Sequence, residues 1–265
     1  MSLLSIEWLK LKKYRTFWVL TGLFAVLLPL WNYLIASGIL KMGGDSKKGV
    51  NLLDTAYTFP GIWGNLGFWA GLFVWFIAIL VIIITTNEYT FRTHRQNIID
   101  GWTRLQFFHG KALFVLILSV ALSVYFFLLG AVMGGYYSHG FSNIMSGITE
   151  LGYFFITCLD YLGFALLIAF AIRRSGLAIG LFLLYAMIIE NIGKSIINSL
   201  ADKPWGNLMP LQCSDELLPF PLMTMARSLM GSQQQISVNT YAITALCWCV
   251  IYYLLSRILL LRRDW

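Results

Sequence analysis

Residues 87–111 read NEYTFRTHRQNIIDGWTRLQFFHGK and form a polar stretch between two long apolar segments. In the whole chain of 265 residues only 12% are charged, whereas 58% are hydrophobic. A soluble domain usually has about a quarter of its residues charged and a smaller apolar share. The composition therefore predicts a membrane protein, in which this polar stretch is a loop between two membrane-spanning segments.

Six apolar segments are long enough to cross a bilayer, whose hydrocarbon core of about 30 Å requires about 20 helical residues. Their continuous apolar composition predicts helices, because the strands of a membrane barrel alternate in polarity. We therefore expect an all-α membrane protein with six transmembrane helices, in one domain over residues 1–265. The expected spans are 17–37, 63–86, 111–137, 151–172, 176–197 and 239–261.

The basic residues are distributed unequally between the two sides of these spans. Most of the 19 Lys and Arg residues fall on the side that holds both termini and the 87–111 stretch. Because the side richer in Lys and Arg faces the cytoplasm, we expect both termini and this loop to be cytoplasmic. The net charge of +7 is then explained by topology and by membrane lipids as partners, so no nucleic acid is expected.

Two further segments are expected beside the spans. Residues 1–16 carry Leu4, Trp8 and Leu11 on one face, which predicts an amphipathic helix at the membrane surface. Residues 198–238 hold four of the six prolines and apolar pieces too short to span. They either re-enter the membrane or form an ordinary external loop, and the fold prediction takes this segment as partly re-entrant.

The sequence contains no motif of a catalytic, cofactor or metal site. There is no HExxH or GxSxG, and the three histidines and four cysteines have no metal-binding spacing. Gly193-Lys194-Ser195 resembles the end of a phosphate-binding loop, but Ile188 stands where that loop needs glycine. We therefore expect no enzyme activity and no cofactor bound by this chain.

Several polar residues lie within the predicted spans, where ionisable groups are costly and often functional. Asp160 is in the fourth span, and Glu190 and Lys194 in the fifth are four residues apart and expected to pair. Either this pair only satisfies its own charges, or it belongs to a polar patch on a transport path. The possible path residues are Asn65, Trp69, Glu190, Asn191 and Lys194.

The 87–111 stretch has the pattern of a short helix, a turn and a second helix. One face of the first helix combines two basic residues with an apolar tip: Arg92, Arg95 and Ile99. Asp100-Gly101 is a turn signal that ends this helix. Thr103 and Gln106 have the spacing of a capping box, which predicts a new helix that runs into the third span. The stretch either only connects two spans or presents a small surface to a cytoplasmic partner.

These features resemble the ABC-2 type permeases of bacterial ABC transporters. In that family the segment between the second and third spans carries an acidic residue, a coupling helix, a Ser/Thr-Arg pair and a Gly-Lys pair. The matching residues here are Glu88, the helix with Arg92 and Arg95, Thr103-Arg104 and Gly110-Lys111. The sequence departs from the pattern at Thr93-His94, where many members have Gly-Thr, and at Gly101-Trp102, where many have Pro and a small residue. The layout of the amphipathic helix, six spans and external segment extends the resemblance to the whole chain.

The resemblance implies a type V exporter-like fold and a permease driven by separate ABC ATPase subunits. ATP and Mg²⁺ would bind to those subunits, and a second permease copy would complete a homodimer in the bacterial cytoplasmic membrane. The alternatives are a multi-span channel, an assembly factor and, least favoured, an intramembrane enzyme. Fold does not identify the cargo, although the apolar, aromatic spans favour an amphipathic or hydrophobic one.

The resemblance also assigns roles within the loop. Arg92 and Arg95 would make polar contacts with the ATPase, and Ile98 and Ile99 would make apolar contacts. Glu88 and Arg104 would brace the coupling helix against neighbouring segments, and the turn at Arg173 and Arg174 would form a second contact. The complete set of expected coupling residues is Glu88, Arg92, Arg95, Ile98, Ile99, Asp100, Gly101, Arg104 and Lys111.

Overall fold

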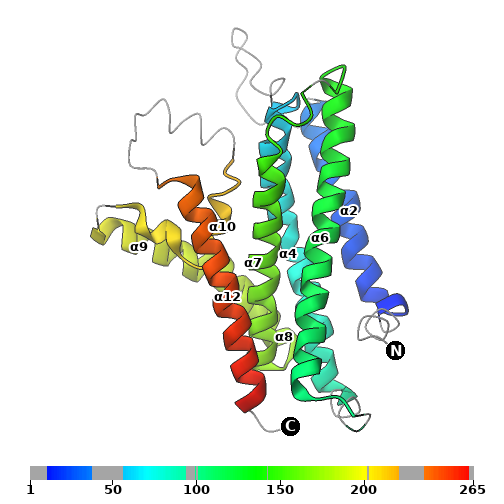
Figure 1. Ribbon diagram of the computed structural model, residues 1–265, viewed down its shortest axis with the longest axis vertical. Coiled ribbons are helices and arrows are strands. Elements are labelled where there is room, and N and C mark those ends of the chain that lie inside the picture. The colour runs from blue at the N-terminus through cyan, green and yellow to red at the C-terminus, as the bar shows by residue number, and fades with distance from the viewer. Residues whose placement is uncertain are drawn as a thin grey trace.

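The structure, a computed structural model, describes residues 11–37, 56–93, 99, 101–141, 143–201, 203–220 and 236–262. Every regular element in these ranges is helical, which confirms the predicted all-α fold (Figure 1). Most of the predicted amphipathic helix over residues 1–16 lies outside the described ranges.

Six stretches of helix are long and apolar enough to cross a membrane, which confirms the six predicted spans. Five are single helices: α2 (Arg15–Ala36), α4 (Gly61–Thr90), α6 (Arg104–Tyr137), α7 (Thr149–Ile172) and α12 (Val238–Arg262). The fifth span in chain order is a series of α8 (Ser175–Leu184), a π-helical turn η1 (Tyr185–Ile189) and α9 (Glu190–Ala201). In Figure 1, α9 lies across the direction of α7 and α12 and projects sideways from the bundle.

The third span begins at Arg104, earlier than the predicted residue 111, because its first turn is capped. The Thr103 hydroxyl accepts from the Gln106 amide at 3.2 Å, and the Gln106 side chain accepts from the Thr103 amide at 2.8 Å. This confirms the predicted capping box, which satisfies amide groups that a helix start leaves open. With 34 residues in α6 and 30 in α4, both helices exceed the length needed for a core of about 30 Å. Together they carry the 91–103 connection beyond the hydrocarbon.

α7 is the central helix and packs against α4, α6 and α12 (Figure 1). One stripe of its surface is fully enclosed: Phe154, Cys158, Leu162, Ala165 and Ala169. This spacing places the five side chains on one side of the helix, and the two alanines let a neighbouring backbone approach closely. The other elements are therefore positioned with respect to α7.

Part of the predicted external segment folds back against the bundle. The 3₁₀ turn η2 (Pro204–Leu208) contacts α9 and α12, and the short helix α10 (Gln212–Asp215) contacts α7 and α12. Cys213 and Ser214 are fully buried there, so this part is not an exposed loop. Residues 221–235 lie outside the described ranges.

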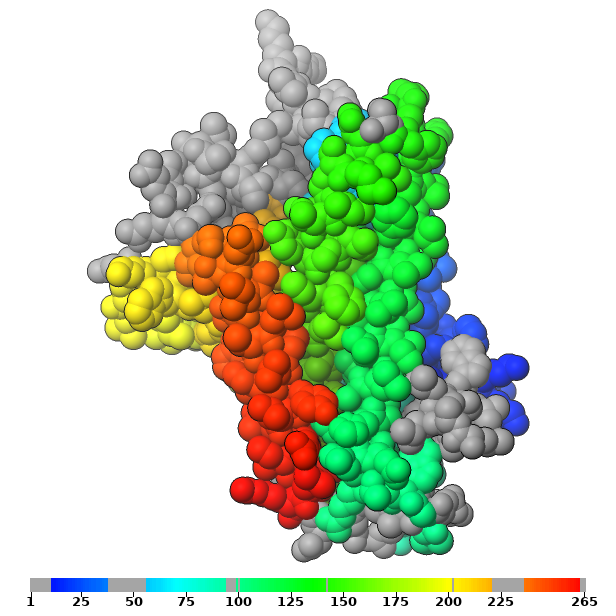
Figure 2. All heavy atoms as spheres, in the orientation of Figure 1, coloured from blue at the N-terminus to red at the C-terminus, as the bar shows by residue number. Residues whose placement is uncertain are grey.

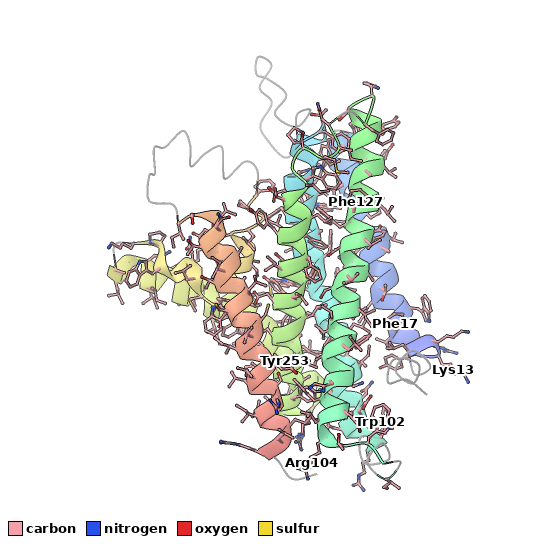
Figure 3. All side chains as sticks on the ribbon, viewed as in Figure 1. Lys13, Phe17, Trp102, Arg104, Phe127 and Tyr253 are labelled. Carbon is pink, nitrogen blue, oxygen red and sulfur yellow. The ribbon has the colours of Figure 1, made fainter. Side chains whose placement is uncertain are left out.

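The basic side chains gather at one end of the bundle, which we call the basic end. It holds the 91–103 connection, the α7–α8 turn, the start of α2 and the end of α12, and lies at the bottom of Figure 1. Figure 3 labels Lys13, Trp102 and Arg104 in this region. The described residues at this end are Lys12, Lys13, Arg15, Arg92, Arg104, Lys111, Arg173, Arg174, Arg257 and Arg262.

Gly130 of α6 makes room for Trp63 of α4, and we predict that Gly130→Ala destabilises the protein. An added Cβ would lie 2.9 Å from Cε3 of Trp63. The indole ring is fully buried and its Nε1 donates to the Ile144 carbonyl at 3.1 Å, so the ring cannot shift without losing this bond. Such overpacking costs about 1–3 kcal/mol.

The check is the melting temperature of the purified protein in detergent, with Gly152→Ala as the matched control. Gly152 lies in α7 and an added Cβ there meets no atom within 4 Å. Gly130→Ala is expected to melt several degrees lower than the wild type and the control. Equal melting temperatures for the two variants would contradict this account of the α4–α6 contact.

Candidate functional site

Glu88 and Lys111 form a buried ion pair where the 91–103 connection leaves the bundle, and we call them the loop-base pair. Glu88 lies near the end of α4, Lys111 lies near the start of α6, and Nζ is 2.5 Å from Oε1. Lys111 is 0% and Glu88 6% exposed. Since an unpaired charge at such a position would be very costly, the pair fixes the two helices against each other.

Arg104 connects the start of α6 to α12. Its Nη1 donates to the carbonyl of Leu261 at 3.4 Å. Leu261 lies in the last turn of α12, where the helix dipole favours a cation. Glu88 thus contacts α6 and Arg104 contacts α12, and their expected role in bracing the coupling helix stays a prediction.

Among its described residues, the connection exposes one basic side chain, Arg92, and two apolar side chains, Phe91 and Ile99. Arg92 is exposed and has a left-handed backbone conformation with φ of 55°. Ile99 is 81% exposed. Gly101 has φ of +94°, a conformation that glycine adopts without strain and that fits the predicted turn. Arg95, Ile98 and Asp100 lie outside the described residues.

Arg173 and Arg174 form the turn between α7 and α8 beside the end of α4. The Cζ atom of Arg173 lies 4.8 Å from the ring centroid of Tyr89 in α4, a cation–π contact. Arg174 is exposed. The predicted second contact site is therefore joined to the same helix end that carries Glu88.

Glu190 caps α10 from α9. Its Oε1 accepts from the amide of Leu211 at 2.6 Å and from that of Gln212 at 3.1 Å. These amides lie at the start of α10, where the helix provides no acceptor and negative charge is favourable. The carboxylate therefore holds residues 211–212 against the fifth span.

Lys194 pairs with Glu216, so the predicted Glu190–Lys194 pair is wrong. Its Nζ lies 2.8 Å from Oε1 of Glu216 and 2.8 Å from Oε1 of Gln212. The four-residue spacing does place Glu190 and Lys194 on one helix face, but the returning segment covers that face and offers each a better partner. Asn191 joins the same contact, because its Oδ1 accepts from Nε2 of Gln212 at 3.3 Å.

Asn65 and Trp69 lie on α4 and take part in other contacts. Trp69 packs edge-on against Trp31 of α2 and against Phe220, with ring centroids 5.3 Å and 6.1 Å away. Asn65 is buried one helical turn earlier. Within the described part of the chain, neither side chain contacts Glu190, Asn191 or Lys194. The five predicted path residues are thus in two groups.

A pocket beside α10 contains an acidic residue that the sequence analysis did not single out. Asp215 accepts from the Tyr161 hydroxyl at 2.7 Å and lines a pocket of about 160 Å³ together with Trp75. Desolvation by the neighbouring helices raises the pKa of Asp215 to about 6, although the side chain itself is exposed towards the pocket. No sequence spacing relates positions 161 and 215, because they meet only when the external segment folds back onto α7.

Comparison with known protein families gives one match that covers most of the chain. Residues 3–189 match the model of a family described as "ABC-2 family transporter protein". The matched range contains α2, α4, α6, α7 and α8, and therefore the loop-base pair and the α7–α8 turn. No curated protein matches the chain.

We predict that Lys111→Ala strongly destabilises the protein, because it leaves the Glu88 carboxylate without its cation in a buried site. Breaking such a pair from one side costs about 3–5 kcal/mol. The double variant Glu88→Gln, Lys111→Met removes both charges at similar volume and is expected to be clearly more stable than Lys111→Ala. Thermal unfolding in detergent measures both, and a single variant as stable as the double would refute the assigned ion pair.

Asp215 predicts a pH dependence of stability with a defined sign. Because its pKa of about 6 lies above the ordinary value of about 3.9, the folded protein holds this proton more tightly than the unfolded chain. The contribution of Asp215 to the free energy of unfolding is therefore full below about pH 4 and is lost as the pH rises through about 6. Asp215→Asn keeps an acceptor for Tyr161 but cannot ionise.

The test compares the melting temperatures of the wild type and Asp215→Asn from pH 4 to pH 7.5. The melting temperature of Asp215→Asn is expected to increase relative to that of the wild type as the pH rises, with most of the change between about pH 4 and 6. Tyr161→Phe, which removes the donor but leaves the carboxyl, serves as a control that retains a pH dependence. A constant difference between Asp215→Asn and the wild type across this range would contradict the raised pKa.

Proposed function

The chain belongs to the ABC-2 transporter family, and on this premise we propose that it is the permease of an ATP-driven exporter coupled to a separate ATPase subunit. The family and the six membrane-spanning helices make it a membrane transport permease. Permeases of this family work in general with ATPase subunits. The direction of transport and the coupling through residues 87–111 are the proposed parts.

The observation that carries the proposal is the rigid base of the 91–103 connection. The loop-base pair ties α4 to α6, and the connection between them exposes Arg92 and Ile99. An exposed isoleucine and an exposed arginine in the same connection suit a partner surface that offers an apolar notch and acidic or polar groups. A connection that served only to join two spans would not require a buried ion pair at its base.

We infer that movement of the connection is transmitted to the bundle through α4. Closure of the ATPase subunits on ATP and Mg²⁺ would displace the connection, and α4 and α6 would move together because of the loop-base pair. α4 packs along α7 and also contacts Arg173 through Tyr89. The displacement would therefore reach the central helix and the α7–α8 turn at once and open an outward path.

We further propose that the permease acts as a homodimer in the bacterial cytoplasmic membrane with its basic end in the cytosol. The excess of Lys and Arg at this end supports the orientation, because the basic side of a membrane protein faces the cytoplasm. It also places the 91–103 connection where a soluble ATPase can reach it. ATP hydrolysis belongs to the partner in this proposal.

We predict that Arg92→Glu combined with Ile99→Asp disrupts assembly with the ATPase. Both positions are exposed, so the changes are expected to leave folding unaffected while they reverse a charge and remove the apolar contact. Loss of two such contacts weakens binding by about 2–4 kcal/mol, or roughly 30- to 1000-fold. Co-purification with a co-expressed ABC ATPase, and the stimulation of its ATP hydrolysis, measure the effect.

The matched control makes the same two changes at the opposite end of the bundle, as Lys203→Glu with Met145→Asp. Both of these side chains are also exposed. The control is expected to assemble with the ATPase and to stimulate it like the wild type. If the Arg92 and Ile99 variant also retains full assembly and stimulation, the 91–103 connection is not the coupling element.

A further inference from the structure

A groove between α6, α7 and α12 opens on the surface of the bundle towards its basic end. Its volume is about 450 Å³, within the range of about 300–1,000 Å³ that small-molecule sites have. Its walls are mainly apolar, with Leu113 and Leu116 from α6 and Leu159 and Leu166 from α7. Figure 2 shows the face where α12 meets α6, and Figure 3 places Tyr253 between these helices in the lower half.

Tyr252 and Ser256 of α12 form part of the wall of this groove, and their side chains are only 2% and 1% exposed. Their hydroxyl oxygens are enclosed by protein and do not reach the open space of the groove. The two residues are four apart on α12 and therefore lie one above the other along the groove.

The end of the groove nearest the basic end carries polar and cationic groups. The His109 ring stacks on Tyr253 with centroids 6.5 Å apart, and both residues line the groove. Arg257 follows Ser256 directly and is exposed. Arg104 reaches the last turn of α12 through its contact with Leu261. An arginine guanidinium is well suited to hold a phosphate.

We propose that this groove binds an anionic glycerophospholipid of the cytoplasmic leaflet. An acyl chain lies along the leucines, and the phosphate lies beside Arg257 and Arg104. The order of these groups in a phospholipid, from apolar chain to phosphate, follows the order of the groove towards the basic end. The proposal rests on the proposed function only for the side of the membrane that this end faces.

Other occupants fit the groove less well. A second copy of this chain, related by a two-fold axis along the membrane normal, would bring its own Arg257 to the same rim, and the like charges would repel each other. A zwitterionic lipid fills the apolar part equally but gains less from the arginines, because its ammonium group partly cancels the phosphate. Negative charge of the head group is therefore the property to test.

The experiment uses the full-length protein in detergent and measures retained lipid by native mass spectrometry. Phosphatidylglycerol and phosphatidylethanolamine with identical chains are added at equal concentration. Phosphatidylglycerol is expected to bind more tightly, and Arg257→Gln to reduce this preference by about tenfold, which corresponds to about 1.4 kcal/mol.

A second pair of variants tests the groove itself. Ala112→Phe places a ring in the groove, because Ala112 lines it, and is expected to abolish the tightly held lipid. Val124→Phe is the control, since Val124 is 54% exposed on the same helix and is not part of the groove lining. Both variants are compared for melting temperature without added lipid, so that loss of fold is recognised.

Equal binding of the two lipids, or wild-type lipid retention by Ala112→Phe, would show that only bulk lipid lies there and would overturn the proposal. A change of oligomeric state in Ala112→Phe, without loss of lipid, would identify a second copy as the occupant and would also overturn it. The assay contains no ATPase, and Arg92→Glu with Ile99→Asp is expected to bind lipid normally. Failure of the lipid site is therefore distinguishable from failure of the proposed coupling.

Discussion

The buried contact between Glu88 and Lys111 joins α4 and α6, the two longest single helices among the described residues, at the base of the 91–103 connection. Without this ion pair, a force on the connection could move the ends of α4 and α6 independently, because helices joined only by apolar packing can slide past each other. With it, the base of the connection is a fixed point, because separating the charges would leave each of them buried alone. We interpret the lengths of both helices and the capping box at Thr103 as features that contribute to a rigid base.

The charged residues Glu190 and Lys194 must also be paired within the bundle, but their partners come from another part of the chain. Charges cannot remain unpaired deep in an apolar bundle, and Glu190 and Lys194 obtain their partners from the segment that returns after α9. The carboxylate receives two backbone amides, whereas the ammonium receives a carboxylate and an amide oxygen. The returning residues 203–220, in which Pro204, Pro210 and Pro219 prevent a long helix, are held in this way against α7, α9 and α12.

Sequence patterns with a short range were sufficient for most of the fold. The apolar lengths predicted six spans, and the spacing of Thr103 and Gln106 predicted the start of α6, because both signals depend on neighbouring residues. The predicted Glu190–Lys194 pair was wrong because the actual partners of both residues are distant in sequence. Local spacing shows which residues share a helix face but not which segment covers that face. The contacts of Glu88 with Lys111, and of Tyr161 with Asp215, join positions that are distant in sequence, and no periodicity relates them.

The two ends of the bundle therefore differ in how readily they can rearrange. At the basic end, the connection is carried by long helices that a buried ion pair joins, and we expect these helices to move together. Around α10, the segment is held by hydrogen bonds to Glu190 and Lys194 and by the Asp215 carboxylate that opens onto a pocket. Hydrogen bonds at a pocket can be exchanged for bonds to water at modest net cost, whereas interlocked apolar side chains adopt discrete alternatives. A displacement imposed at the base is thus expected to be transmitted unchanged along α4 and α7 and to be absorbed around α10.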